Sequence, residues 1–440
     1  MFAVLLSIGL LAHQFIYILM YRREYLTLSF APALGLTLPR PVFTAVQIAA
    51  VPVISILMIL GGRAATFAAL VTLLLWSSIQ SLRMSNHVWL ALFGVLVFAF
   101  STPAEHVVEA RMLLGYLYVA AGVFKCNSEF LLSDRSLARG MVNRQASSFH
   151  VRAPKLFVAL SPAAVVLGEL GAGVMLLLNY RLDIAFLVCA GLHLAFSILG
   201  NAHFALIALA FWYEALGGSQ SFTELLNSNA ALLVTVIVIG GLSGYVIGNH
   251  TLHGSRIKGG LADALLVGIY CAAAVLVWKS AATSTPREGE WSAGAVVVLA
   301  AFSLNFVLLF LGLKGEWAFA MFSNVRPYGK AKILGIAPRW RTTYFRVEWD
   351  GDFPKPVSDA LPRHVMAQVK DRRNVVSGPV AHELGMTSEK FSTGLRLIPQ
   401  KYDEVADGFV DLQDSEVKLK RGPIWVAPII SRDPEAAHKG

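Results

Sequence analysis

The first segment of the chain decides the fold: Phe2–Met20 reads FAVLLSIGLLAHQFIYILM. It contains no Asp, Glu, Lys or Arg, and as a helix it is long enough to cross a hydrocarbon layer of about 30 Å. No basic segment precedes the apolar run, and no small-residue cleavage site follows it. We therefore predict a retained membrane helix rather than a removed signal peptide.

Similar apolar runs recur as far as Leu313. Hydrophobic residues make up 56% of the chain and charged residues 15%, whereas about 25% of a soluble domain is charged. This composition excludes a single water-facing globule and predicts an all-α polytopic membrane helical bundle, with about eight to eleven transmembrane helices. The further spans expected are Ala45–Leu60, Ala65–Leu82, Val88–Phe100, Val107–Phe124, Leu156–Leu178, Ile184–Leu199, Phe204–Ala215, Ala230–Ile247, Leu261–Val277 and Ala293–Leu313.

The chain changes character after the last of these spans. We predict a transmembrane domain over residues 1–313 and a small basic C-terminal domain over residues 314–440, rich in charge and proline. Tyr344–Trp349 alternates between apolar and polar residues before an Asp350-Gly351 turn signal, which is typical of a strand. Val417–Leu419 and Ile424–Ile430 are predicted as further strands of a β-containing domain.

The formal charge of +9 is spread over loops and tail, without a basic stripe interleaved with aromatic residues. This pattern predicts contact with membrane lipid and no nucleic-acid partner. Cys126, Cys189 and Cys271 are too few and too scattered for a disulfide framework or a zinc site, so no metal is expected.

Lysine and arginine are distributed unevenly between the two sides of the predicted membrane domain. The tail lies on the side that carries most of them, which we call the basic side. This basic side receives Arg22, Arg23, Arg40, Arg83, Arg135, Arg139, Arg144, Arg152, Arg256 and Lys258, and the other side receives Arg63, Arg181, Lys279 and Arg287.

Four ionisable residues lie at or inside apolar spans, where charge is costly and marks function by default. His87 and Lys125 stand at the ends of consecutive spans, and Glu169 and His193 lie inside the next two. Because consecutive spans alternate in direction, we expect all four side chains to converge beneath the basic side. Other interpretations stay open: Lys125 at the headgroups, His87 as a wetted helix cap, and Glu169 and His193 as polar contacts between helices.

These residues occur in a pattern that resembles the vitamin K-dependent gamma-carboxylases and their bacterial relatives, the horizontally transferred transmembrane (HTTM) domain proteins. Asn86-His87 is similar to an Asn-His pair that begins a helix in the carboxylase. Ala121-Gly122-Val123-Phe124-Lys125 resembles the end of a Tyr-rich helix, to which Tyr118 belongs. Glu169 before a leucine run, and His193 followed by His203-Phe204, are similar to the next two helices.

The resemblance extends over about residues 43–326 and ends with Trp317–Asn324, which is similar to a Met-Phe-Ser signature of bacterial members. Two motifs depart from the family pattern. Phe124 replaces the first of two lysines, and Asn127-Ser128-Glu129-Phe130 replaces an Asp-x-Asp-Trp run. The tail is also much smaller than the lumenal domain of the carboxylase, which bears on how a protein substrate would dock.

The resemblance implies a lysine base that deprotonates a reduced quinone of the vitamin K or menaquinol type. Reaction with O2 then generates a strong base that removes a proton from a glutamate γ-carbon, and CO2 adds to the carbanion. The substrate of this protein would be a peptide or small molecule that need not contain glutamate. Lys125 would be the initiating base and His87 would assist, with Asn86, Tyr118, Glu169 and His193 in supporting or substrate-binding roles. A lysine accepts a proton only where burial favours its neutral amine, whereas a carboxylate against it favours the ammonium.

Two other functions remain open from the sequence. One is a non-enzymatic membrane scaffold, or an immunity or maturation partner for a secreted peptide. The other is a transporter with Glu169 and His193 as a proton relay. The sequence shows no pair of interrupted helices at equivalent positions in two halves of the chain, which many transporters have. We expect a bacterial inner membrane protein. The positive-inside rule places the basic side in the cytoplasm, whereas the resemblance places it on the outer side.

Overall fold

The computed structural model describes most of the chain. The described residues are 1–310 apart from 28–37, 80–85, 135, 149, 219, 252–256 and 284–291, followed in the tail by 333, 334, 343–355, 357, 361, 366, 369–371, 374–390, 395–403, 408–412 and 429–431.

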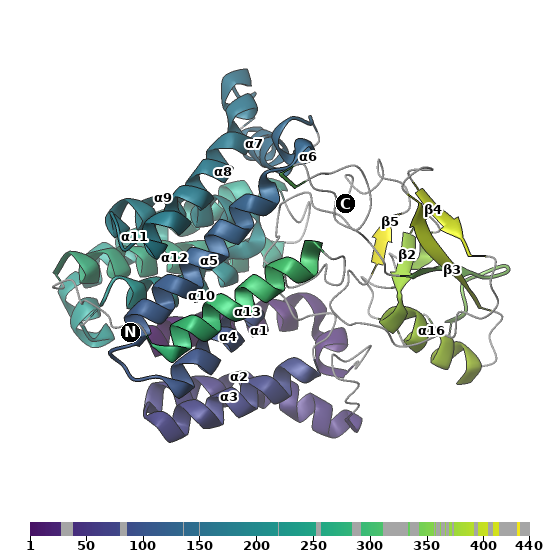
Figure 1. Cartoon of the computed structure of the whole chain (residues 1–440), viewed down its shortest axis with the longest axis horizontal. Coiled ribbons are helices and arrows are strands. Elements are labelled where there is room, and N and C mark those ends of the chain that lie inside the picture. The colour runs from purple at the N-terminus through teal and green to yellow at the C-terminus, as the bar shows by residue number, and fades with distance from the viewer. Residues whose placement is uncertain are drawn as a thin grey trace.

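Each of the eleven predicted spans overlaps a helix, so the predicted helical bundle is confirmed (Figure 1). Residues 80–82 and 311–313, at the ends of two of these spans, lie outside the described residues. Two shorter helices, α6 (Ser128–Leu131) and α7 (Leu137–Ser148), follow the fifth span. The long helices are α1 (Phe2–Thr27), α2 (Arg40–Leu60), α3 (Arg63–Ser78), α4 (Asn86–Phe100), α5 (His106–Lys125), α8 (Lys155–Leu177), α9 (Leu182–Phe196), α10 (Ala202–Ala215), α11 (Phe222–Thr251), α12 (Ile257–Thr283) and α13 (Ala293–Phe310).

The bundle has the surface of a multi-pass membrane protein. Among the described residues, six helices are long and apolar enough to cross a membrane: α1, α2, α5, α8, α11 and α12. Large apolar side chains are exposed on the outer helices, such as Leu156, Phe157 and Leu167 on α8, and Val238 and Leu242 on α11. Such a surface is stable in contact with lipid, and it is far more apolar than the surface of a soluble protein.

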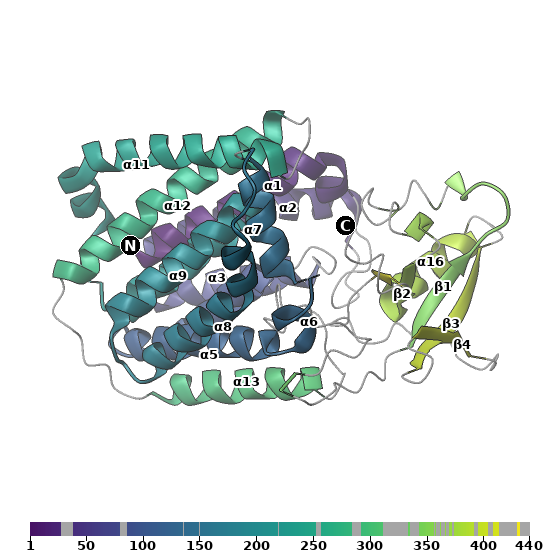
Figure 2. The same cartoon turned by 90° about the horizontal axis from the view of Figure 1, so that it is seen from above.

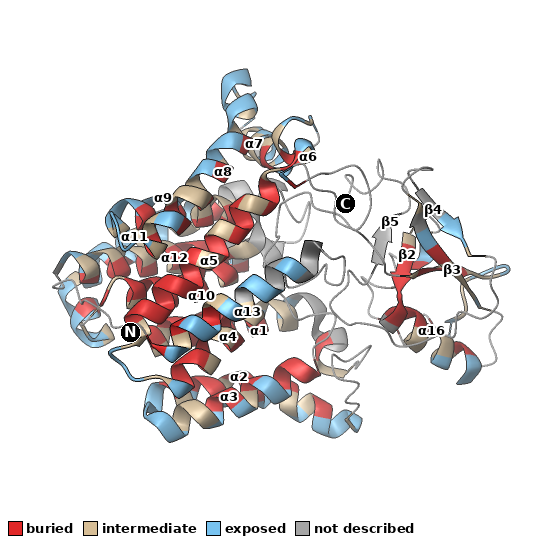
Figure 3. Ribbon diagram, viewed as in Figure 1, coloured by how far each residue is buried: buried red, intermediate tan, exposed pale blue. Residues whose placement is uncertain are grey.

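Helix α10 forms the centre of the bundle. Nearly every residue from Ala202 to Tyr213 is buried, and Figure 3 shows α10 and α5 as the most continuously buried helices. A helix that is apolar all round is stable only when other helices surround it. Helices α1, α4, α5 and α12 pack around α10; α11 and α12 pair at one edge, and α13 lies along α5 at the opposite edge (Figure 2).

Local sequence explains two of the connections. Gly61 and Gly62 adopt φ values of 70° and 81°, a region that favours glycine, and they turn the chain sharply between α2 and α3. Between α9 and α10 the chain forms a π-helix, η2 (Ser197–Asn201). Such wide turns are rare and occur frequently at functional sites.

The tail contains a five-stranded antiparallel sheet in the order β4-β3-β1-β2-β5. Helix α16 (Gly378–Lys390) follows β2, and a small core forms around Phe345, Val376, Val380 and Leu384. The strands are β1 (Tyr344–Glu348), β2 (Asn374–Ser377), β3 (Arg396–Asp403), β4 (Gly408–Asp411) and β5 (Ile429–Ser431).

The predicted β-containing tail is confirmed in its class and in part of its detail. Strand β1 matches the predicted Tyr344–Trp349, and Gly351 of the predicted turn has a φ of 67°. Strand β5 overlaps the end of the predicted Ile424–Ile430, whereas Val417–Leu419 lies outside the described residues. The predicted domain boundary at residues 313 and 314 also lies outside them.

Candidate functional site

Two glycines bring α5 and α8 into close contact. A Cβ atom on Gly173 would lie 2.8 Å from the carbonyl oxygen of Gly115, and one on Gly115 would lie 3.1 Å from the carbonyl oxygen of Gly173. Small residues at such a crossing let two membrane helices approach until their backbones touch. The close crossing fixes which side chains of α5 and α8 face each other further along the pair.

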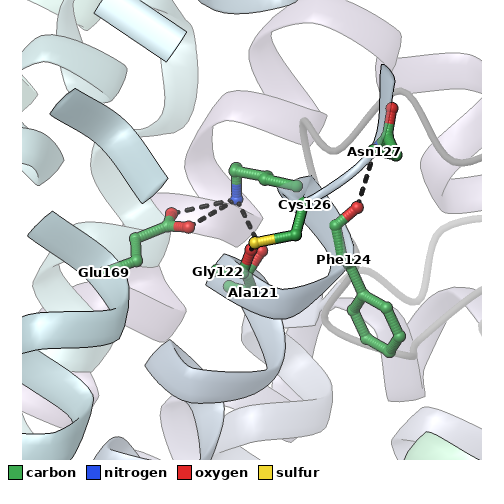
Figure 4. A network of polar contacts seen from close by, with 7 residues as sticks. Ala121, Gly122, Phe124, Cys126, Asn127 and Glu169 are labelled. Carbon is green, nitrogen blue, oxygen red and sulfur yellow. Dashed lines mark hydrogen bonds and ion pairs between the residues drawn. The ribbon is translucent and has the colours of Figure 1, made fainter. Parts of the chain in front are cut away.

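The principal polar contact of this helix pair joins Lys125, the last residue of α5, to Glu169 of α8. The Lys125 Nζ atom lies 2.8 Å from Glu169 Oε2 and donates a hydrogen bond of 3.0 Å to Oε1, with both side chains almost completely buried (Figure 4). It also approaches the carbonyl oxygen of Ala121 at 3.4 Å. Lys125 therefore meets a carboxylate in the interior.

This contact corrects two of the interpretations made from sequence. Only 1% of Lys125 is exposed, so its amine is enclosed by protein and does not extend to lipid headgroups. The expected meeting of Lys125 with His87 is not found among the described residues, because the hydrogen bonds of Lys125 go to Glu169 and to the carbonyl oxygen of Ala121.

The end of α5 is fixed by the residues that follow Lys125. Asn127 Nδ2 donates to the carbonyl oxygen of Phe124 at 2.8 Å (Figure 4). Its Oδ1 accepts from the Phe130 backbone N–H at 2.8 Å and caps α6. The backbone N–H of Leu334 donates to the carbonyl oxygen of Cys126 at 3.0 Å. Lys125 is thus held at a rigid helix end.

A pocket opens beside Lys125. It encloses about 440 Å³ of empty space, its open mouth included, between helices α6, α7, α8 and α9. The polar side chains in its wall are those of Lys125, Gln145 and Ser161, and Gln145 Nε2 donates to the carbonyl oxygen of Ala195 at 3.2 Å, linking α7 to α9. The apolar residues of the wall are Phe130, Ala138, Met141, Val142, Val165, Leu192, Ala195 and Phe196.

A second polar contact lies deeper along α5. The Tyr118 hydroxyl lies 2.7 Å from His193 Nε2 of α9 and accepts a hydrogen bond of 3.0 Å from Trp212 Nε1 of α10. All three residues are buried. Tyr118 and His193 were both predicted as site residues, and the structure joins them directly to each other.

His87 lies in a third group, with two histidines that the sequence analysis did not assign to the site. Its Nε2 lies 2.5 Å from Nδ1 of His13 on α1, and its ring centroid lies 4.2 Å from that of His203 on α10. Asn86, the residue before it, has a buried Oδ1 without a hydrogen-bond partner among the described residues. The four side chains that were expected to converge therefore lie in three different clusters.

The sequence analysis did not assign His13, His203 or Trp212 to the site. The signal that marked His193, an ionisable residue in an apolar span, applied equally to His13, whereas His203 precedes the predicted Phe204–Ala215 and Trp212 is not ionisable. The sequence does not show which helices are neighbours, so the relation of His13 to His87 was hidden. Trp317–Asn324, which carries the last motif of the resemblance, lies outside the described residues.

No protein family model matches the chain, and no curated protein or solved structure matches it either.

Proposed function

We propose that the protein is an integral membrane enzyme that binds a reduced quinone, or a similar flat phenolic molecule, in the pocket beside Lys125. The Lys125–Glu169 pair would take up the hydroxyl proton of this molecule. The observation that carries the proposal is a buried amine–carboxylate pair whose lysine forms part of the wall of an apolar pocket. Buried ionisable groups in a pocket are candidates for proton transfer.

The lining of the pocket fits such a molecule by chemistry. Sites for small molecules combine apolar walls with a few polar groups that fix orientation. Here the walls are apolar and carry three polar side chains, Lys125, Gln145 and Ser161. A ring would lie among Met141, Val165 and its apolar neighbours, with a hydroxyl directed at Lys125.

The ion pair can supply a neutral amine as a base without any change in the net charge of the pair. Transfer of one proton from Lys125 Nζ to a carboxylate oxygen of Glu169 gives a neutral amine beside a neutral acid. This neutral pair would carry no charge that needs solvation in the apolar interior. The free lone pair of the amine could then accept a proton from the bound hydroxyl, which restores the ammonium beside a neutral carboxylic acid.

The resemblance supplies the remaining chemistry of the proposal. Oxidation of the reduced quinone by O2 would drive removal of a proton from a substrate carbon, and CO2 would add to that carbon. The substrate would be a peptide or small molecule, and the enzyme a carboxylase-like lyase of a bacterial inner membrane. Among the described residues, Lys125 hydrogen-bonds to Glu169 and Ala121 and to no imidazole, so the proposal rests on Lys125 and Glu169 and not on His87.

The test is formation of product that depends on reduced quinone, measured with labelled CO2 on purified protein in lipid nanodiscs. Lys125→Ala should abolish the label, whereas Lys155→Ala, at an exposed lysine at the start of α8, should retain it. Circular dichroism of each variant shows whether the bundle is intact. Unchanged labelling in a folded Lys125→Ala protein would remove Lys125 from the mechanism.

A purely structural role is the second candidate, and the close crossing of α5 and α8 favours it. Here the Lys125–Glu169 pair holds two helices together in a membrane scaffold, or in an immunity or maturation partner of a secreted peptide. A Lys125→Met/Glu169→Leu protein that still binds and protects its partner peptide would support this alternative. Loss of quinone binding in the same folded protein would support the enzyme.

A further inference from the structure

Three histidines from three different helices meet inside the bundle. His13 stands in the middle of α1, His87 is the second residue of α4, and His203 is the second residue of α10. One ring nitrogen from each lies within 4.8 Å of the others. His13 and His87 are almost fully buried, and the trio shares no residue with the Lys125–Glu169 pair.

The surrounding residues hold these rings in place. The indole of Trp76 packs edge-on against the His13 ring, with the ring centroids 5.7 Å apart. The ring of Tyr17, one turn further along α1, has its centroid 4.5 Å from that of His13. Trp76 is itself fixed, because its Nε1 donates to Gln47 Oε1 at 3.2 Å. His203 lies two residues after the end of the π-helix η2, a geometry found frequently at functional sites.

We propose that His13, His87 and His203 bind a first-row transition-metal ion of the zinc and copper type. Imidazole nitrogen suits these ions, and three histidines that leave a fourth position open are a recurrent ligand set for them. Three neutral ligands leave the charge of a divalent ion uncompensated. The fourth position would therefore take an anion such as hydroxide or a substrate carboxylate, or the ion would be monovalent copper.

The distances agree with such a site after a small rotation of two rings. Ligand nitrogens about 2.0 Å from a tetrahedral ion lie about 3.3 Å apart. The nitrogens of His13 and His87 are 2.5 Å apart, and all three ligating atoms fall within 4.8 Å. The closest pair must open by about 0.8 Å, which small changes in the side-chain torsions provide. Without metal, the same two nitrogens share one proton in a hydrogen bond.

The competing explanation is a trio of neutral histidines that only packs and hydrogen-bonds in the core. Metal content distinguishes the two. Purified full-length protein in detergent is stripped with a chelator, reloaded with Zn²⁺ or Cu⁺, and analysed by mass spectrometry. One equivalent per chain is expected, with affinity at least tenfold lower in each of His13→Gln, His87→Gln and His203→Gln. The control His106→Gln changes a part-buried histidine stacked on Phe98 and should bind as the wild type.

A second measurement needs no variant and covers the case in which a substitution prevents folding. X-ray absorption on the reloaded wild-type protein should show three nitrogen ligands from imidazole. Absence of a stoichiometric ion, sulfur or oxygen ligands in place of imidazole, or equal binding by folded His87→Gln protein would overturn the proposal. Because the readout is metal and not activity, it stands or fails independently of the Lys125→Ala test.

Discussion

The amine of Lys125 and the carboxylate of Glu169 lie 2.8 Å apart in a part of the bundle where both are shielded from solvent. A buried pair of this kind contributes little net stability, because the attraction between the charges is offset by the solvation that they lose. Net stability alone therefore does not account for the pair. The pocket beside Lys125 offers a reason for it, because a ligand hydroxyl placed there would meet a group that can change its protonation.

Removing one member of the pair should destabilise the protein strongly. Glu169→Leu leaves the Lys125 ammonium buried without its carboxylate, and we expect a loss of about 3–5 kcal/mol in the free energy of unfolding. Lys125→Met/Glu169→Leu replaces both charges with apolar groups and should recover most of that loss. Chemical unfolding in mixed micelles measures both values; a double variant no more stable than the single one would contradict this account.

The crossing of α5 and α8 should tolerate no side chain at Gly173. In Gly173→Ala the new methyl group meets the backbone of Gly115 and of Val119 at 2.8 Å, and we expect destabilisation of about 1–3 kcal/mol. Gly171→Ala is the matched control on the same helix, since its Cβ has open space around it and alanine favours helix. Equal unfolding temperatures for the two variants would show that the helices are not in contact there.

The hydroxyl of Tyr118 should matter for stability. Tyr118→Phe removes the group that accepts from Trp212 and contacts His193, leaving both partners buried, and a loss of about 1–3 kcal/mol is expected. At the exposed Tyr180, the same substitution should change stability by less than about 0.5 kcal/mol. Thermal unfolding of the two variants side by side makes the comparison.

The topology predicts which loops share a side of the membrane. In a protein whose native cysteines are replaced, a cysteine at Ser147 on α7 and one at Lys401 on β3 should react with an impermeant maleimide from the same side. A cysteine at Tyr180, between α8 and α9, should react only from the opposite side. Reaction of Ser147→Cys and Tyr180→Cys from one common side would refute the assigned helix directions.

The membrane bundle could be predicted from the sequence because a helix that lies in hydrocarbon needs a long apolar run. Such runs are visible directly in the sequence. Helix α10 coincides with the predicted Phe204–Ala215 within two residues. In the tail, β2 has four residues and β3 contains Pro399, so neither has a clear alternating pattern, and their pairing with β1 depends on residues far away in sequence.

The candidate site was predicted only in part, for a similar reason. A polar residue in an apolar span marks a candidate, and this signal found Lys125, Glu169 and His193. It does not tell which candidates meet. The contact of Lys125 with Glu169 depends on the glycine crossing of α5 and α8, and that of His87 with His13 depends on how α1 and α4 lie against α10.

The central claim is that the pocket beside Lys125 binds a reduced quinone. The most direct measurement is saturation binding of a soluble reduced naphthoquinone to wild-type protein, Met141→Trp and Asn143→Trp in nanodiscs under anaerobic conditions. Met141 lines the pocket, whereas Asn143 is exposed on the same helix. The account predicts saturable binding that Met141→Trp weakens at least tenfold and Asn143→Trp leaves unchanged. Equal affinity in all three folded proteins would contradict it.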